Sequence, residues 1–233
     1  MRRITFYSEG RDGKSTLALS LSLALASQGR NVFLLKITSN INEELEELEI
    51  EGLKPLNEFI KGKETFRETT SSIENLCNIM DGNVLFAVLS SDYELINVYG
   101  ESLMDIISNK IDDVYFINDI IVDGSPNAKE LSTIMMLSSD VVLIPFRPLK
   151  ESIMNAYKLS RILNHFNITH YLIMNMASYN SGEILKFISQ ITKCKVIGMV
   201  PAYDIEEEST LIFKLARSNI MKLLIEKISE KVR

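Results

Sequence analysis

A short stretch near the N-terminus combines the residue types that bind phosphate. It reads ITFYSEGRDGKST over Ile4–Thr16, with glycines at Gly10 and Gly13 and the charged Lys14 directly after the second glycine. Glycines let a backbone turn so that its N–H groups point inward at phosphate oxygens. A lysine ammonium can then contact the β- and γ-phosphates, while the hydroxyl of Ser15 can contact Mg²⁺. The pattern therefore predicts a phosphate-binding loop, or P-loop, in front of a helix N-terminus.

The surroundings of this loop decide how it is interpreted, because a bare Gly-Lys-Ser tripeptide also occurs by chance. Ile4–Tyr7 is β-branched and aromatic, which predicts a strand, and an apolar run with helical spacing follows the loop. The general pattern G-x-x-x-x-G-K-[ST] is not met, since Ser8 occupies its first glycine position. The alternative is an ordinary strand, turn and helix with a capping serine. We predict a nucleotide-binding loop with these contact residues: Glu9, Gly10, Arg11, Asp12, Gly13, Lys14, Ser15 and Thr16.

The loop resembles the variant x-K-G-G-x-G-K-[ST] of the ParA/MinD family of P-loop ATPases. Four positions match: Gly10, Gly13, Lys14 and Ser15. Two depart, because Glu9 stands at the family's signature lysine and Arg11 at its second glycine. The resemblance implies that the signature lysine reaches across a nucleotide-sandwich homodimer to the partner's phosphates. A carboxylate would repel phosphate, which leaves open whether Arg11 or Lys36 supplies the missing charge.

The second predicted strand, Asn31–Ile37, also departs from the family. Its continuous apolar run is typical of a parallel strand covered on both faces. The family ends this strand with D-x-D, and Lys36 and Thr38 occupy those positions here. The resemblance implies that the first Asp holds the water shell of Mg²⁺ and that the second orients the attacking water. Because neither carboxylate is present here, we expect weak ATP hydrolysis. Thr38, which can hydrogen-bond water, is the predicted catalytic residue at the second position. Lys36 could lie on the γ-phosphate, pair with Asp123 or Glu9, or point to solvent.

A second chemical landmark is the segment Asp119–Pro126, in which an apolar run ends at Asp123 before Gly-Ser-Pro. It resembles the Walker B and switch II segment of the family. The resemblance implies that Asp123 and Ser15 hold Mg²⁺, that Lys14 and Asp123 act in catalysis, and that the backbone of Gly124 senses the γ-phosphate. The alternative is that Asp123 caps a following helix.

Two later positions are predicted to contact the base of the nucleotide. The strand His170–Met174 ends at Asn175, and the last predicted strand, Lys195–Val200, runs into the loop Pro201–Asp204. The resemblance implies that Asn175 reads the adenine edge and that the loop beginning at Pro201 packs on the adenine ring. For Asn175 the alternative is a turn residue at a strand end.

Length and composition predict a single P-loop nucleotide-binding domain over residues 1–233. Hydrophobic residues make up 46% and charged residues 24% of the chain, which favours a packed core over disorder. We expect an α/β fold of three layers, in which a mostly parallel sheet carries helices on both faces and binds nucleotide at the carboxyl ends of its strands. The remaining predicted strands are Val84–Leu89, Ile120–Asp123 and Val141–Pro145. The predicted helices are Leu17–Gln28, Glu43–Glu51, Leu53–Ile60, Phe66–Asn78, Tyr93–Asn109, Lys129–Leu137, Ile153–Asn164, Ile184–Ile191, Glu206–Ala216 and Ile220–Val232.

The charge distribution bears on the partners. The net charge is −6, yet residues 147–233 hold 13 Lys/Arg against 8 Asp/Glu, which suggests a local basic face or simply solvated surface lysines. The candidate DNA contacts are Lys186, Lys193, Lys195, Lys214 and Arg217. The sequence has no apolar run long enough to predict a membrane span. The last predicted helix mixes acidic with basic residues, which favours a surface-packed helix over a membrane anchor. The two cysteines are compatible with a reducing cytoplasm.

The resemblance implies an ATP-dependent homodimer that binds DNA nonspecifically and is stimulated by a ParB-like centromere-binding protein. Such a switch would segregate a plasmid or chromosome and would lie on the nucleoid. The alternatives are a MinD-like protein that positions cell-pole or pilus machinery, a nucleotide-binding scaffold of the same family that does not hydrolyse ATP, and a dethiobiotin-synthetase-like ligase. The sequence shows no group of acidic or basic residues that would form the substrate pocket of such a ligase. Its two histidines, His165 and His170, lie in or beside apolar runs, which is typical of structural histidines.

Overall fold

In the described part of the chain, the strands form one eight-stranded sheet. The computed structural model describes residues 1–41, 52–73, 82–112, 115–178, 181–192, 196–203 and 208–231. The strands are β1 (Arg2–Phe6), β2 (Val32–Thr38), β3 (Ser71–Ser72), β4 (Val84–Ser90), β5 (Asp119–Asp123), β6 (Val141–Phe146), β7 (His170–Ala177) and β8 (Val196–Pro201). Their order is β3-β4-β2-β5-β1-β6-β7-β8, and each pair is parallel except β3 with β4. The predicted mostly parallel α/β sheet is therefore confirmed.

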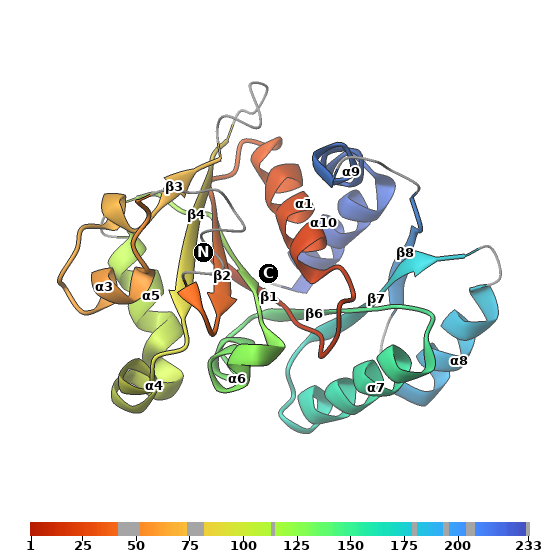
Figure 1. Cartoon of the computed structure of the whole chain (residues 1–233). Helices are drawn as coiled ribbons and strands as arrows, with labels where there is room; N and C mark the ends of the chain where they lie inside the picture. Colours follow the sequence, from red (N-terminus) through yellow and green to blue (C-terminus); the bar gives the residue numbers. More distant parts are fainter. Residues whose placement is uncertain are drawn as a thin grey trace.

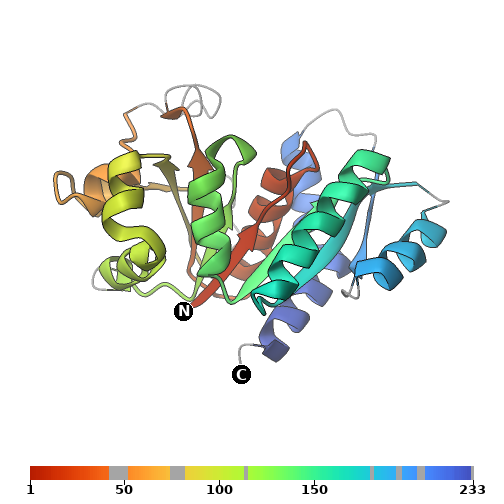
Figure 2. The ribbon, with the colours of Figure 1, turned by 90° about the horizontal axis from the view of Figure 1, so that it is seen from below.

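Helices cover both faces of the sheet (Figures 1 and 2). One face carries α1 (Lys14–Ala26), α9 (Glu208–Ala216) and α10 (Asn219–Lys231). The other face carries α3 (Leu56–Ile60), α4 (Tyr93–Tyr99), α5 (Leu103–Asp112), α6 (Lys129–Leu137), α7 (Lys150–His165) and α8 (Gly182–Thr192). Side chains alternate between the faces, because successive residues of a strand point to opposite sides. In β2, Val32 and Leu34 pack on the α1 side, whereas Phe33 and Leu35 pack on the α3 side.

Helix α1 is apolar nearly all round because it is enclosed. Its sequence is KSTLALSLSLALA, and every residue from Leu17 to Ala26 except Leu19 is buried. The sheet covers one side of it, and α9 and α10 lie beside it on the same face of the sheet and contact it (Figure 1). A helix without a polar face is stable only when neighbours cover it in this way. None of the described helices combines the length and the apolar character that a membrane span requires.

Two predicted helices differ from the structure. The segment Tyr93–Asn109 is divided into α4 and α5 by a 3₁₀ turn, because Gly100 takes φ 47° and ends α4. The segment Phe66–Asn78 begins with a 3₁₀ turn, Phe66–Glu68, and then enters β3, which pairs with β4. A hydrogen-bonded neighbour outweighed the local helical pattern there.

Several predicted features lie outside the described residues. These are the helix Glu43–Glu51, the end of Phe66–Asn78, Lys193, Lys195, Asp204, the beginning of Glu206–Ala216 and the last residue of Ile220–Val232.

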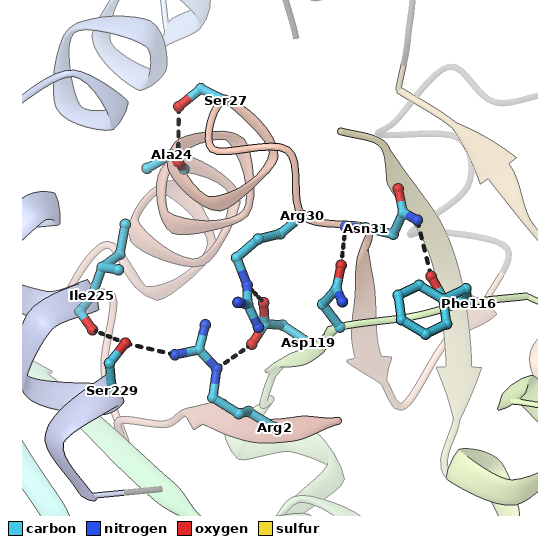
Figure 3. Close-up of polar contacts among 10 residues, drawn as sticks. Arg2, Ala24, Ser27, Arg30, Asn31, Phe116, Asp119, Ile225 and Ser229 are labelled. Atoms are coloured by element: carbon cyan, nitrogen blue, oxygen red, sulfur yellow. Dashed lines mark hydrogen bonds and ion pairs between the residues drawn. The ribbon is translucent and has the colours of Figure 1, made fainter. Parts of the chain in front are cut away.

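A buried ion network joins the amino ends of the central strands (Figure 3). Asp119, at the start of β5, is fully buried and accepts hydrogen bonds from Arg2 of β1 and from Arg30 before β2. Arg2 also donates to the hydroxyl of Ser229 in α10, at 2.9 Å. Two guanidinium groups thus compensate one carboxylate that water does not reach. The predicted P-loop lies at the opposite, carboxyl end of β1, so this network supports the fold rather than the site.

Candidate functional site

The predicted P-loop connects β1 to α1. Gly13, directly before α1, has φ 77° and ψ 29°, in the left-handed region that favours glycine. A Cβ at this position would lie 2.2 Å from Nδ2 of Asn175, so glycine is required for space as well as for conformation. Among the residues that the structure describes, no side chain caps the helix, and its first turn holds no acidic residue. The N-terminus of α1 therefore carries the positive end of the helix dipole, which favours an anion.

Lys14 bridges the loop. Its Nζ donates a hydrogen bond to the backbone oxygen of Gly10, at 2.9 Å. Burial lowers the pKa of Lys14, and the nearby charge of Lys36 lowers it further, while Asp123 and other carboxylates raise it. The ammonium of Lys14 thus bonds to a carbonyl oxygen of the loop, close to the N-terminus of α1. A phosphate oxygen bound at this place could replace that carbonyl as its hydrogen-bond acceptor.

Lys36 lies between the two residues that the sequence predicts as Mg²⁺ ligands. The parallel register of β2 and β5 pairs Lys36 with Asp123, and its Nζ is 2.8 Å from Oδ2 of that carboxylate. The same ammonium donates to Oγ of Ser15 at the start of α1, at 2.9 Å. Among the positions that the sequence left open for Lys36, the structure shows the ion pair with Asp123. Asp123 does not cap a helix, because the cap of the following 3₁₀ turn is Ser125.

The residues present do not fit a Mg²⁺ ion held between Ser15 and Asp123. A divalent cation prefers oxygen ligands, but the ammonium of Lys36 is within hydrogen-bond distance of both oxygens and would repel the ion. Within the described ranges, no group of three His, Cys, Asp or Glu residues could hold a metal. One oxygen of Asp123, Oδ1, is buried and has no hydrogen-bond partner among the described residues.

Glu9, at the signature-lysine position, faces neighbours within the chain. Its Oε1 accepts a hydrogen bond from the hydroxyl of Tyr7, at 3.3 Å, and lies 3.4 Å from Nζ of Lys129 at the start of α6. Burial raises the pKa of Tyr7, and the charge of Glu9 raises it further. Arg11 is exposed to solvent. The sequence analysis missed Lys129, although its place as the first residue of the helix after Asp123 could have indicated it.

Asp12 anchors the loop to the strands beside it. The residue is buried, and its Oδ1 accepts a hydrogen bond from Ser152 of α7 at 2.8 Å. Nε of Arg147, which follows β6, is 3.6 Å from the same oxygen. The backbone oxygen of Asp12 accepts a further hydrogen bond from Nδ2 of Asn175, at 2.8 Å. Arg147 and Ser152 were not predicted; the signal was a charged residue directly after a buried strand, at the edge where the site lies.

The other predicted site residues are placed around the carboxyl edge of the sheet. Thr38 ends β2 with its Oγ1 accepting from the N–H of Asn40, at 3.1 Å, so this hydroxyl is part of a turn. The N–H of Gly124 donates to the oxygen of Phe6, at 2.9 Å, and thus continues the pairing of β1 with β5. Pro201 is exposed at the end of β8. The catalytic and adenine-contact roles of these residues, and of Asn175, stay predictions.

Comparisons with known proteins identify the family. A family model described as an AAA domain matches residues 1–177. The chain belongs to this family. A comparison of the sequence with curated proteins found no match.

Solved structures share the fold of this AAA-domain chain. In the MinC:MinD cell division protein complex of Aquifex aeolicus, the match has a TM-score of 0.75 at 16% identity and covers 98% of this chain and 96% of that one. MinD of Pyrococcus horikoshii complexed with Mg-ADP gives 0.65 at 19% identity, over 98% and 95%. A putative plasmid partition protein of Borrelia burgdorferi bound to AMPPNP gives 0.63 at 20% identity, over 97% and 99%. The predicted resemblance to the ParA/MinD P-loop ATPases is confirmed.

The predicted DNA contacts of this AAA-domain chain do not share one layer. Lys186 lies on α8, whereas Lys214 lies on α9 and Arg217 directly after it, and all three are exposed. Helices α8 and α9 cover opposite faces of the sheet near β8 (Figure 1). The ammonium of Lys214 is 4.6 Å from the ring centroid of Tyr203, a cation–π contact that orients this basic side chain.

Proposed function

We propose that the chain is a nucleotide-dependent switch of the ParA/MinD kind that binds ATP or ADP at the loop between β1 and α1. The observation that carries this proposal is the uncapped N-terminus of α1 behind the left-handed Gly13, with the ammonium of Lys14 across the loop. Such an arrangement supplies both backbone donors and a positive charge for phosphate. The family match supports it, as do fold neighbours with bound Mg-ADP and AMPPNP.

Calorimetry with ATP and ADP tests the binding. We expect the wild type to bind both, and Lys14→Ala to weaken binding by about tenfold or more, since a charge-assisted contact to phosphate is lost. The matched control is Lys158→Ala, which removes an exposed lysine of α7 and should bind as the wild type does. A folded wild type without any response to either nucleotide would contradict the proposal.

The proposed switch turns over slowly. Thr38, at the position from which the family's carboxylate orients water, contributes only a hydroxyl, which bonds in a turn with Asn40. Phosphoryl transfer depends on positioning and charge, so a missing water-orienting carboxylate lowers the rate. The same observation favours the second candidate, a scaffold that binds nucleotide without hydrolysis. Steady-state phosphate release separates them: a rate above that of Lys14→Ala indicates a slow ATPase, and an equal rate indicates the scaffold.

The cargo and partners belong to the same proposal. We propose that ATP favours a homodimer that binds DNA nonspecifically, that a ParB-like protein regulates it, and that it lies on the nucleoid in the cytoplasm. The basic balance after residue 147 and the exposed Lys214 and Arg217 support this.

Filter binding of a DNA duplex with ATP, at several salt concentrations, tests the DNA contact. If the protein contacts DNA phosphates, its affinity for DNA should fall steeply as salt rises. The double variant Lys214→Glu, Arg217→Glu should then bind DNA duplexes of any base sequence more weakly than the wild type. An ATP-loaded dimer without affinity for DNA would favour a MinD-like positioning role instead.

A further inference from the structure

We propose that the ammonium of Lys36 is a built-in cation of the nucleotide site, which takes the place of a protein-held Mg²⁺ and makes nucleotide binding independent of divalent metal. The inference rests on the proposed nucleotide binding at the β1–α1 loop and adds the cation that this site uses. The geometry that carries it is the position of Nζ between Ser15 and Asp123, at 2.9 and 2.8 Å.

The fold holds Lys36 in this position. In β2, the side chains of Val32 and Leu34 point to the α1 face, and the alternation of the strand places Lys36 on the same face. In β5, Ile121 points to that face, and the alternation places Asp123 there too. Because the register pairs Lys36 with Asp123 at the carboxyl edge, the ammonium and the carboxylate meet beside the first turn of α1.

The ion pair between Lys36 and Asp123 is largely buried. The side chain of Asp123 is only 4% exposed and that of Lys36 is 20% exposed. A carboxylate removed from water needs a cation next to it. In a metal-dependent site a bound ion supplies that positive charge, whereas here the side chain of Lys36 supplies it. The site therefore carries its compensating cation before any ligand arrives.

The hydrogen bonds also change what Ser15 can do. A hydroxyl that coordinates a metal uses its oxygen lone pair on the ion. Here that oxygen accepts a hydrogen bond from Lys36 instead, and the hydroxyl proton of Ser15 can donate to a phosphate oxygen. Lys14, on the same loop, adds a second ammonium. Two ammonium groups and a hydroxyl donor are together a set of phosphate ligands that requires no metal.

A purely structural ion pair makes a different prediction. If Lys36 only neutralised Asp123, its removal would lower the stability of the fold but leave nucleotide affinity intact. If Lys36 is the cation of the site, its removal lowers affinity, and a carboxylate at position 36 creates a demand for metal.

The experiment measures ADP affinity by calorimetry, once in EDTA and once in Mg²⁺. We expect the wild type to bind with affinities that agree within about twofold in the two buffers, whereas Lys36→Asp, which places a second carboxylate beside Asp123, should bind about tenfold or more tightly in Mg²⁺ than in EDTA. Lys36→Met keeps the length of the side chain without its charge. It should lose about tenfold in ADP affinity in EDTA.

Thermal unfolding of each variant shows that it is folded, and Lys36→Met serves if Lys36→Asp is not. A wild type that binds ADP only with Mg²⁺ would overturn the inference while leaving the proposed nucleotide binding in place. Unchanged ADP affinity of Lys36→Met would overturn it as well. A folded wild type that binds ADP in neither buffer would instead contradict the proposed function itself, and the inference with it.

Discussion

The side-chain amide of Asn175 donates a hydrogen bond to the backbone oxygen of Asp12, over a distance of 2.8 Å and a separation of 163 residues. The end of β7 thereby fixes the shape of the loop after β1. The same amide is the nearest atom to the place where a side chain at Gly13 would begin. The conformation of the P-loop thus depends on a strand that is far from it in the sequence.

Asn175→Ala should destabilise the protein. The change removes the donor to the buried carbonyl of Asp12, and an unsatisfied buried acceptor costs about 1–3 kcal/mol. Denaturant unfolding measures the loss. The ratio of ATP to GTP affinity, measured on the same variant, should stay that of the wild type. A changed ratio with unchanged stability would instead favour the adenine contact that the sequence predicts for Asn175.

Gly13→Ala should destabilise the protein more than an alanine at another left-handed glycine. Both Gly13 and Gly62 have positive φ, 77° and 73°, and a left-handed alanine costs roughly 1–2 kcal/mol. Only at Gly13 would the new Cβ also meet Nδ2 of Asn175, whereas nothing lies within 4 Å at Gly62. Chemical denaturation of the two variants isolates the extra steric cost. Equal losses would mean that the loop adjusts freely.

Asp119→Asn should cost about 3–5 kcal/mol of unfolding free energy, because it leaves the guanidinium groups of Arg2 and Arg30 without their buried carboxylate. The matched control is Asp105→Asn, which breaks the exposed pair with Arg3 and should change stability by about 0.5 kcal/mol or less. Urea titrations of both variants provide the comparison. Similar values for the two would show that burial of the network contributes little.

His170 should make stability depend on pH below neutrality. Nδ1 of its buried ring donates to the oxygen of Ile168, at 2.8 Å, and Nε2 lies 2.8 Å from the hydroxyl of Ser160. Burial lowers the pKa of His170 below its ordinary value of 6.5. The unfolded chain therefore binds the proton first, so this contribution is complete above the unfolded pKa and declines as pH falls below about 6.5.

Unfolding free energies between pH 7.5 and 5.5 test this dependence. His170→Gln should reduce the slope, and His165→Gln, at an exposed position of α7, should retain it. A slope that is the same in the wild type and in His170→Gln would assign the dependence to other groups.

The sequence predicted the strands of the sheet better than its helices. A buried parallel strand such as Val141–Phe146 is a continuous apolar run, and seven such runs were recognised. The eighth strand, Ser71–Ser72, has no apolar pattern and exists because β4 pairs with it. The break between α4 and α5 depends on the positive φ of Gly100, which a helical pattern does not reveal. Local periodicity is visible in a sequence, but pairing partners are not.

The sequence by itself predicted the position of the phosphate-binding loop. Gly10, Gly13, Lys14 and Ser15 lie within one short loop, so their chemistry and spacing are contiguous in the chain. Only the tertiary structure decided how that loop is held and which cation lies beside it. Lys36 meets Asp123 across 87 residues, and Asp12 meets Ser152 across 140. The physical reason is that parallel strands bring their carboxyl ends to one edge, and strand order and register, which no local pattern fixes, decide which side chains meet there.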